Sequence, residues 1–124
     1  MKKITTHVAL LLFSLLFTGL VGMAQTTAPA KPEMKTYVIE RNIPGAGQFT
    51  AQKLKDISQT SCAVLKDMGP GIQWMQSYVT DNKIFCVYKA ENIELLKEHA
   101  KKGGFPINAI YEVSNVISPA TAAN

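Results

Sequence analysis

GPGIQWMQSYVTDNKIFCVY, residues 69–88, decides the fold, because it combines a helix stop, a strand, a tight turn and a return strand. Gly69 and Pro70 end the helical pattern that precedes them. Residues 72–79 and 84–88 are rich in β-branched and aromatic side chains, which favour strands. The stretch therefore predicts a β-hairpin that begins where a helix stops.

The turn of this hairpin decides which side chains share a face. If Asp81-Asn82 forms a two-residue turn with positive φ, Thr80 faces Lys83 and the register follows by counting outward. A longer loop is the alternative and would shift this register. With the two-residue turn, the smaller side chains, which suit a packed helix, lie on one face: Met75, Ser77, Val79, Ile84, Cys86 and Tyr88. The other face carries Trp74, Gln76, Tyr78, Phe85, Val87 and Lys89. This second face is aromatic, which is unusual for a surface that meets only water.

The N-terminal residues have the pattern of a secretory signal. Lys2-Lys3 precede an apolar block over residues 8–21, and residues 22–24, GMA, form a small-x-small cleavage pattern. An uncleaved anchor is the alternative, because the block approaches the lower end of the ~17–25 residues that span a bilayer. Residue 25 is not the cysteine that a lipoprotein anchor requires. Residues 1–24 therefore predict export to the periplasm or the medium, with no stable membrane anchor after cleavage.

The charge gives no support to a nucleic-acid surface. The 124 residues contain 13 Lys and Arg and 9 Asp and Glu, a formal charge of +4. Because Lys2 and Lys3 belong to the signal, the exported part has a formal charge of +2, and its lysines alternate with acids. A domain of about 100 residues buries roughly 60–70% of its unfolded surface, so pairing of two chains would add stability.

Two helical patterns flank the hairpin. Thr50 is a typical N-cap for a helix that runs to Met68, and Asn92 is a typical N-cap for a second helix over residues 93–102. Gly103-Gly104 ends the second helix. The first helix has a core-facing stripe at helical spacing: Leu54, Ile57, Ser61, Leu65 and Met68.

Two further segments favour strands at the ends of the folded unit, residues 35–41 and 109–117. Residues 25–33 are small, polar and proline-bearing, which predicts a flexible leader, and residues 118–124 form a polar tail. One domain over residues 34–117 remains.

The order strand, helix, strand, strand, helix, strand is that of a ferredoxin-like βαββαβ sandwich, a fold of the α+β class. Both helices cover one face of a four-stranded antiparallel sheet, and the other face is bare. Small domains of this shape commonly dimerise through the bare face. The sequence therefore predicts a homodimer, a dimeric α+β barrel, with Trp74, Tyr78 and Phe85 on the face between the subunits.

Few side chains of the exported part could carry chemistry. His99 is its only histidine, because His7 lies in the signal, so a transition-metal site must add other ligand types or a partner subunit. Alternatively, His99 packs against the helix end. Serine catalysis has weak support, since no serine lies in a nucleophile-elbow motif. A Cys86–His99 pair is conceivable, and the loop over residues 44–47 lacks the Lys-Ser/Thr of a P-loop, so it is interpreted as a connector.

Cys62 and Cys86 lie in a part of the chain that would reach an oxidising compartment. Three alternatives follow: inert thiols, a Cys62–Cys86 disulfide that joins the first helix to the sheet, or metal ligation. Glu40 and Glu112 lie on predicted strands, either as paired acids or as surface charges.

The residues also resemble a known family. YVIERNIPGAG (37–47), SCAVLKDMGPGIQWMQSYVTDNKIFCVYKA (61–90) and LLKEHAKKGGFPINAIYEV (95–113) are similar to small ferredoxin-like proteins long of unknown function, a family named for a nickel-binding member. Its most specific pieces are GPGIQW with SYVTDNKIFCVY, and EHAKKGGFP.

The resemblance implies a dimeric ferredoxin-like fold and a capacity to bind divalent nickel, in metal homeostasis or sequestration, with no established enzymatic activity. Ligand-type side chains in the matching motifs are His99 in EHAKKGG, Cys86 in KIFCVY and Glu40 in YVIER. Relatives are often cytoplasmic proteins that begin near the position of Met34. An export signal argues against an intracellular metal buffer.

Three functions follow as expectations. The first is an exported metal-binding protein, for nickel or another divalent transition metal, without established catalysis. The alternative is a small-molecule-binding protein or an enzyme of the dimeric α/β-barrel type, with a pocket on the aromatic sheet face formed by Trp74, Gln76, Tyr78 and Phe85. A purely structural interaction module is a third.

Overall fold

The computed structural model describes residues 27–123. The predicted signal peptide, residues 1–24, lies outside the described residues. Residues 31–123 form one compact unit. Within residues 27–123, no helix combines the length and the apolar character needed to cross a membrane.

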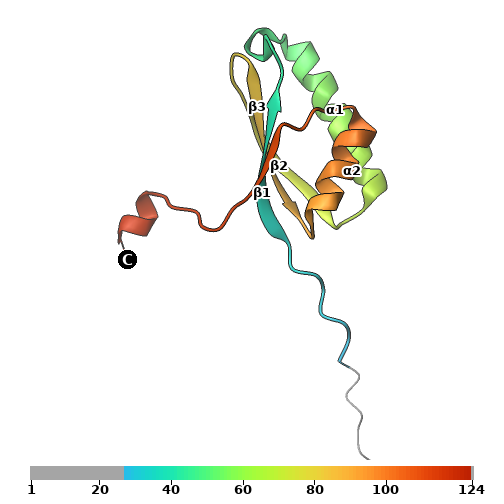
Figure 1. The fold of residues 1–124 in the computed structure, drawn as a ribbon, viewed down its shortest axis with the longest axis vertical. Helices are drawn as coiled ribbons and strands as arrows, with labels where there is room; N and C mark the ends of the chain where they lie inside the picture. The colour runs from blue at the N-terminus through green and yellow to red at the C-terminus, as the bar shows by residue number, and fades with distance from the viewer. Residues whose placement is uncertain (1–26, 124) are drawn as a thin grey trace, which may run out of the picture. The chain divides into compact units, whose positions relative to one another are not determined.

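The elements follow the predicted order and confirm the ferredoxin-like α+β fold (Figure 1). The strands are β1 (Lys35–Asn42), β2 (Ile72–Val79), β3 (Lys83–Ala90) and β4 (Ala109–Glu112). The helices are α1 (Ala51–Met68) and α2 (Ile93–Gly103), with short 3₁₀ turns η1 (Ala46–Gln48) and η2 (Pro119–Ala123). The antiparallel sheet has the order β2-β3-β1-β4, and both helices lie on one of its faces.

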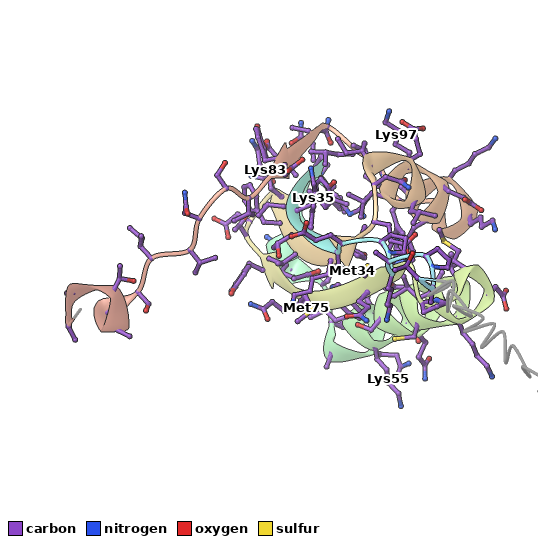
Figure 2. The ribbon with its side chains drawn as sticks, turned by 90° about the horizontal axis from the view of Figure 1, so that it is seen from below. Met34, Lys35, Lys55, Met75, Lys83 and Lys97 are labelled. Carbon is purple, nitrogen blue, oxygen red and sulfur yellow. The ribbon has the colours of Figure 1, made fainter. Side chains whose placement is uncertain are left out.

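Local signals set the ends of both helices where the sequence predicts them. Thr50 Oγ1 accepts a hydrogen bond from the Lys53 backbone N–H at 3.1 Å, and Asn92 Oδ1 accepts one from Leu95 at 3.1 Å. Gly104 follows α2 with a φ of 70°, which glycine adopts without strain. Figure 2 shows the solvent sides of the helices, where Lys55 of α1 and Lys97 of α2 point away from the sheet.

The hairpin closes as predicted at Thr80 and Lys83, where the Thr80 N–H donates to the Lys83 carbonyl at 2.8 Å. The predicted positive φ at Asp81-Asn82 is wrong, since only glycines have positive φ within residues 27–123. The connector loop supports this turn, because the Gly47 N–H donates to Asp81 O at 3.1 Å. A Cβ at Gly47 would lie 2.9 Å from Asp81 Cα, so this approach requires glycine.

The predicted faces hold on β3 and fail on part of β2. A β-bulge at Met75 shifts the register, so Trp74 pairs with Tyr88 and Gln76 pairs with Val87. Because the bulge adds one residue, Trp74 lies on the helix-covered face and Met75 is 47% exposed. The prediction that Trp74 lies on the bare face and Met75 beneath the helices is therefore wrong.

The last strand is shorter than the predicted 109–117. It ends at Glu112, and the Val113 N–H donates to Thr36 O at 2.8 Å. Its partner β1 begins at Lys35, so residues 114–117 have no strand beside them.

The core lies between the sheet and the helices. Its most buried side chains include Ile39 of β1, Tyr88 of β3 and Leu96 of α2, each at most 2% exposed. The predicted stripe of α1 faces this core, but only Ser61 is fully buried, while Leu54, Ile57, Leu65 and Met68 are half-buried. A space therefore remains between α1 and the sheet.

Candidate functional site

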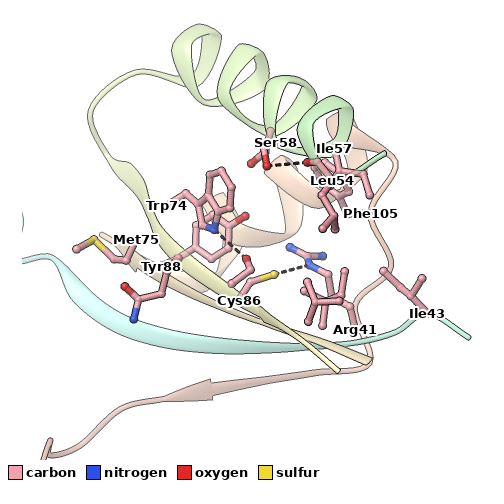
Figure 3. A pocket seen from close by; sticks show the side chains of 15 residues that line it. Arg41, Ile43, Leu54, Ile57, Ser58, Trp74, Met75, Cys86, Tyr88 and Phe105 are labelled. Atoms are coloured by element: carbon pink, nitrogen blue, oxygen red, sulfur yellow. Dashed lines mark hydrogen bonds between the residues drawn. The ribbon is translucent and has the colours of Figure 1, made fainter. Parts of the chain in front are cut away.

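The space beneath α1 is a pocket of about 410 Å³ (Figure 3). Leu54, Ile57 and Ser58 of α1 form one wall, and Trp74, Cys86 and Tyr88 of the sheet form the opposite wall. Met75 and Val79, 47% and 40% exposed, lie at its rim on β2, which is an edge strand. The pocket thus opens beside the edge of the sheet and extends under the helix.

Arg41 lines this pocket and is only 3% exposed. Its Nε donates to Cys86 Sγ at 3.4 Å, and its Nη1 donates to the Pro106 carbonyl at 2.6 Å. Its Nη2 is buried and has no hydrogen-bond partner among residues 27–123. Since the guanidinium of Arg is always charged in proteins, a buried positive charge retains an unused donor group.

No acidic side chain balances this charge within the described residues. Neither a hydrogen bond nor an ion pair joins Arg41 to an Asp or Glu, and no Asp or Glu lines the pocket. Glu40, the next residue along β1, points to the opposite face of the sheet, where it pairs with Lys83. The interior site is therefore electropositive.

The segment after α2 holds the guanidinium in place. The Phe105 ring lies under Arg41, with the guanidinium carbon 5.4 Å from the ring centroid. The same ring stacks on His99 at 5.5 Å between centroids. Gly103 makes room for it, because a Cβ there would lie 2.3 Å from Phe105 Cε2. The EHAKKGGFP motif thus supplies an imidazole, a ring and a carbonyl around Arg41.

His99 is fully buried between the helices and the sheet. Its Nε2 lies 3.2 Å from Ser61 Oγ, and its Nδ1 has no partner. Burial lowers the His99 pKa below its ordinary value of 6.5, and the nearby charge of Arg41 lowers it further. Tyr88 packs on His99 at 5.3 Å between ring centroids, and burial raises the Tyr88 pKa above 10.0. Both groups are therefore neutral at pH 7.

The Ser61–His99 pair is a contact that the sequence reasoning missed. A nucleophilic serine needs a histidine whose second nitrogen is oriented by another group, together with donors for an oxyanion. No hydrogen-bonding group within residues 27–123 contacts His99 Nδ1. We therefore interpret the pair as a polar contact that joins α1 to α2.

The structure does not bring the three predicted metal ligands together. Cys86 and His99 lie on the helix-covered side of the sheet, whereas Glu40 lies on the bare side. Cys86 Sγ accepts a hydrogen bond from Arg41 Nε. His99 Nε2 lies within hydrogen-bond distance of Ser61 Oγ, not of Cys86. Within the described residues, no three His, Cys, Asp or Glu side chains are grouped as metal ligands.

The Cys62–Cys86 disulfide, one of the three alternatives for the cysteines, is not formed. Both thiols are free, with Cys62 exposed on α1 and Cys86 buried beneath the helices. Glu40 and Glu112 do not pair as acids, since Lys83 and Lys35 form ion pairs with them, respectively.

The predicted aromatic pocket divides between two faces. Trp74 lines the interior pocket, and its indole Nε1 donates to Ser77 Oγ at 2.9 Å. Tyr78 and Phe85 pair on the bare face, where Gln76 Nε2 donates to the Tyr78 hydroxyl at 2.7 Å. Arg41 is a pocket residue that the sequence analysis did not single out. The alternation of side chains along a strand could have found it, because Arg41 follows Tyr37 and Ile39 at a spacing of two and therefore faces inward with them.

Comparisons with known proteins agree with this architecture. A family model described as nickel responsive protein SCO4226-like matches residues 37–113. The crystal structure of SCO4226 from Streptomyces coelicolor A3(2) is similar, with a TM-score of 0.57 and 19% sequence identity over 66% of this chain and 99% of that chain. At this identity the likeness supports the fold alone. No curated protein matches the chain.

Proposed function

This chain belongs to the family of SCO4226-like nickel responsive proteins, and we propose that it is a binding protein, not an enzyme, whose ligand is a small organic molecule. The ligand occupies the pocket of about 410 Å³ beneath α1. That pocket is the single observation that carries the proposal.

The size and chemistry of the pocket support this function. The pocket is partly open to solvent beside β2, so a ligand can enter it. Ligand sites typically have about 300–1,000 Å³, with apolar walls and a few convergent polar groups. Here Leu54, Ile57 and Trp74 are apolar walls, and Arg41 and Ser58 are polar.

Binding is more consistent with the site than catalysis. The groups that could transfer a proton or attack a substrate are each engaged or isolated: Cys86 accepts from Arg41, and Ser61 meets His99. His99 itself is 0% exposed, so a ligand in the pocket does not reach its ring without rearrangement. The residues that do face the pocket bind and orient.

Tryptophan fluorescence tests the proposal directly, because Trp74 is the single tryptophan and lines the pocket. Titration with a panel of small aromatic and aliphatic molecules should change its emission saturably. Ser58→Phe fills the pocket from α1 and should weaken binding at least tenfold. Gln59→Phe is the matched control, since Gln59 is the next residue and is exposed on α1. Equal affinity in both variants, or no binding tighter than about 10 mM, would refute the proposal.

Metal binding is the second candidate, favoured by the name of the family and by the unpartnered Nδ1 of His99. An imidazole nitrogen is a good ligand for nickel. The guanidinium of Arg41 beside Cys86 disfavours a second cation there, so the remaining ligands would come from another chain or after Arg41 moves.

Calorimetry with Ni²⁺, Zn²⁺ and Cu²⁺ on the tag-free protein tests the metal candidate. Replacing His99 with Ala should weaken binding at least tenfold if its imidazole is a ligand. Binding weaker than millimolar for every ion would discard this function. Nickel affinity unchanged in the variant would assign His99 to structure.

We also propose that the protein is exported and forms a homodimer. The export proposal rests on the pattern of residues 1–24, and N-terminal sequencing of the protein recovered from the periplasm or medium tests it. The dimer proposal rests on the bare face of the sheet, where Tyr78 and Tyr111 are 57% and 55% exposed.

A further inference from the structure

We infer that the ligand of the interior pocket is a hydrophobic monocarboxylate, whose carboxylate pairs with Arg41. This inference rests on the proposed binding function and names the chemical class of the ligand. Two independent features meet in it: a pocket with mainly apolar walls, and a buried guanidinium on its lining with an unused Nη2 donor group.

The charge balance of the site points to an anion. Transferring a charge out of water is costly unless it is paired and hydrogen-bonded. Arg41 is 3% exposed, yet its two acceptors are a neutral carbonyl, Pro106 O, and a thiol, Cys86 Sγ. No acidic group lines the pocket. A negatively charged ligand supplies the missing partner.

The segment after α2 holds the guanidinium at the wall of the pocket. The guanidinium carbon lies 5.4 Å from the centroid of the Phe105 ring, and both side chains line the pocket (Figure 3). On another side, the Pro106 carbonyl accepts a hydrogen bond from Nη1 at 2.6 Å. Since Nη2 is shielded from solvent, the guanidinium must turn toward the pocket to meet the ligand. Of the two hydrogen bonds that Arg41 makes, the one to Cys86 Sγ is the easier to give up, because sulfur is the weaker acceptor.

The walls decide what the rest of the ligand is. Leu54 and Ile57 offer aliphatic surface, and Trp74 offers an aromatic ring. A free inorganic anion would leave this apolar surface empty. A carboxylate on a small ring or a branched chain would cover it, and each buried CH₂ contributes about 0.8 kcal/mol.

A pair of isosteric ligands tests the inference. Benzoate and benzamide have nearly the same shape, but only benzoate is charged at pH 7. We expect the wild type to bind benzoate at least about tenfold more tightly than benzamide, because a charge-assisted hydrogen bond is roughly twice as strong as a neutral one. Trp74 fluorescence reports both titrations, and hexanoate with hexanamide repeats the comparison for an aliphatic chain.

Two variants test whether Arg41 causes the preference for benzoate over benzamide. In Arg41→Gln, benzoate should lose its advantage while the affinity for benzamide stays within about twofold. Lys83→Gln is the matched control, because it also removes one positive charge but lies beside Glu40, on the bare face of the sheet. It should keep the full preference. Far-UV circular dichroism confirms that each variant is folded, and the wild-type comparison stands if Arg41→Gln does not fold.

The outcomes separate the two proposals. If amides and carboxylates bind the wild type equally, or if Arg41→Gln retains the preference, the carboxylate inference is wrong and the binding function stands. If no carboxylate, amide or other member of the ligand panel binds, the binding function itself is wrong.

Discussion

His99 is a neutral imidazole inside the domain, and its burial predicts how the stability of the fold depends on pH. Burial and the charge of Arg41 lower its pKa below 6.5 in the folded state, so the folded protein binds fewer protons than the unfolded chain below about pH 6.5. Stability should therefore be fully present above pH 6.5 and decrease as the pH falls from about 6.5 toward the folded-state pKa.

Thermal unfolding between about pH 7.5 and 5.5 measures this effect. The midpoint should fall across the window in the wild type and change much less in His99→Gln, whose amide can still meet Ser61. His99 is the only histidine after residue 24, so a protein without residues 1–24 contains no other imidazole that could obscure the result. An equal slope in both proteins would contradict the assignment.

At the residue scale, the sequence predicts whether a side chain faces the core better than it predicts which other side chain it contacts. His99 lies three and four residues after Leu96 and Leu95, which places it in phase with the inward side of α2. Strand alternation likewise places Arg41 inside. The contacts Ser61–His99 and Arg41–Cys86 join residues 38 and 45 positions apart, and no local pattern encodes such pairs.

At the scale of elements, the end of α2 is a precise fit that a single methyl group should break. In Gly103→Ala the new Cβ would lie 2.3 Å from Phe105 Cε2, so the ring must leave its place between His99 and Arg41. Overpacking of this kind typically costs 1–3 kcal/mol, and we expect destabilisation by about this amount.

Urea unfolding gives the free energy of the Gly103→Ala variant. The control is Lys102→Ala, one residue earlier, which loses only an exposed ion pair with Glu98 and should change stability by less than about 1 kcal/mol. If Gly103→Ala is as stable as the wild type, Phe105 can repack and does not anchor Arg41.

Helix ends, which capping residues and glycines mark in the sequence, were predictable. The bulge in β2 and the end of β4, which depend on the adjacent strand, were not. Caps at Thr50 and Asn92 and glycines at 69 and 104 set the helices within a residue or so. The bulge at Met75 has no glycine or proline to mark it, yet it moves Trp74 to the other face and so creates one wall of the pocket. The end of β4 depends on where β1 begins.

At the scale of the whole molecule, the bare face of the sheet predicts association of two chains. Val38 and Val87 are half-buried at its centre, and Tyr78 and Tyr111 are exposed toward its two edges. Val87→Glu places a charge in the middle of this surface, which would be costly to bury unpaired. We expect a dimer for the wild type and a monomer for the variant.

Sedimentation at micromolar concentration distinguishes the two states. Gln59→Glu is the control with the same change of charge, at an exposed position on α1, and it should remain dimeric. A wild type that is monomeric up to about 100 μM would contradict the dimer and leave the bare face to another partner. The fold was predictable at this scale from the element order, whereas the interior pocket was not.

The bulge at Met75 lies on β2, an outermost strand of the sheet. A straight outer strand with unpaired N–H and C=O groups is a template for fibril growth. The bulge interrupts the regular row of backbone N–H and C=O groups on β2, so another chain cannot pair with the whole edge. Deleting Met75 should leave Trp74 and Ser77 facing inward but straighten the strand, and thioflavin fluorescence should then reveal fibrils that the wild type does not form.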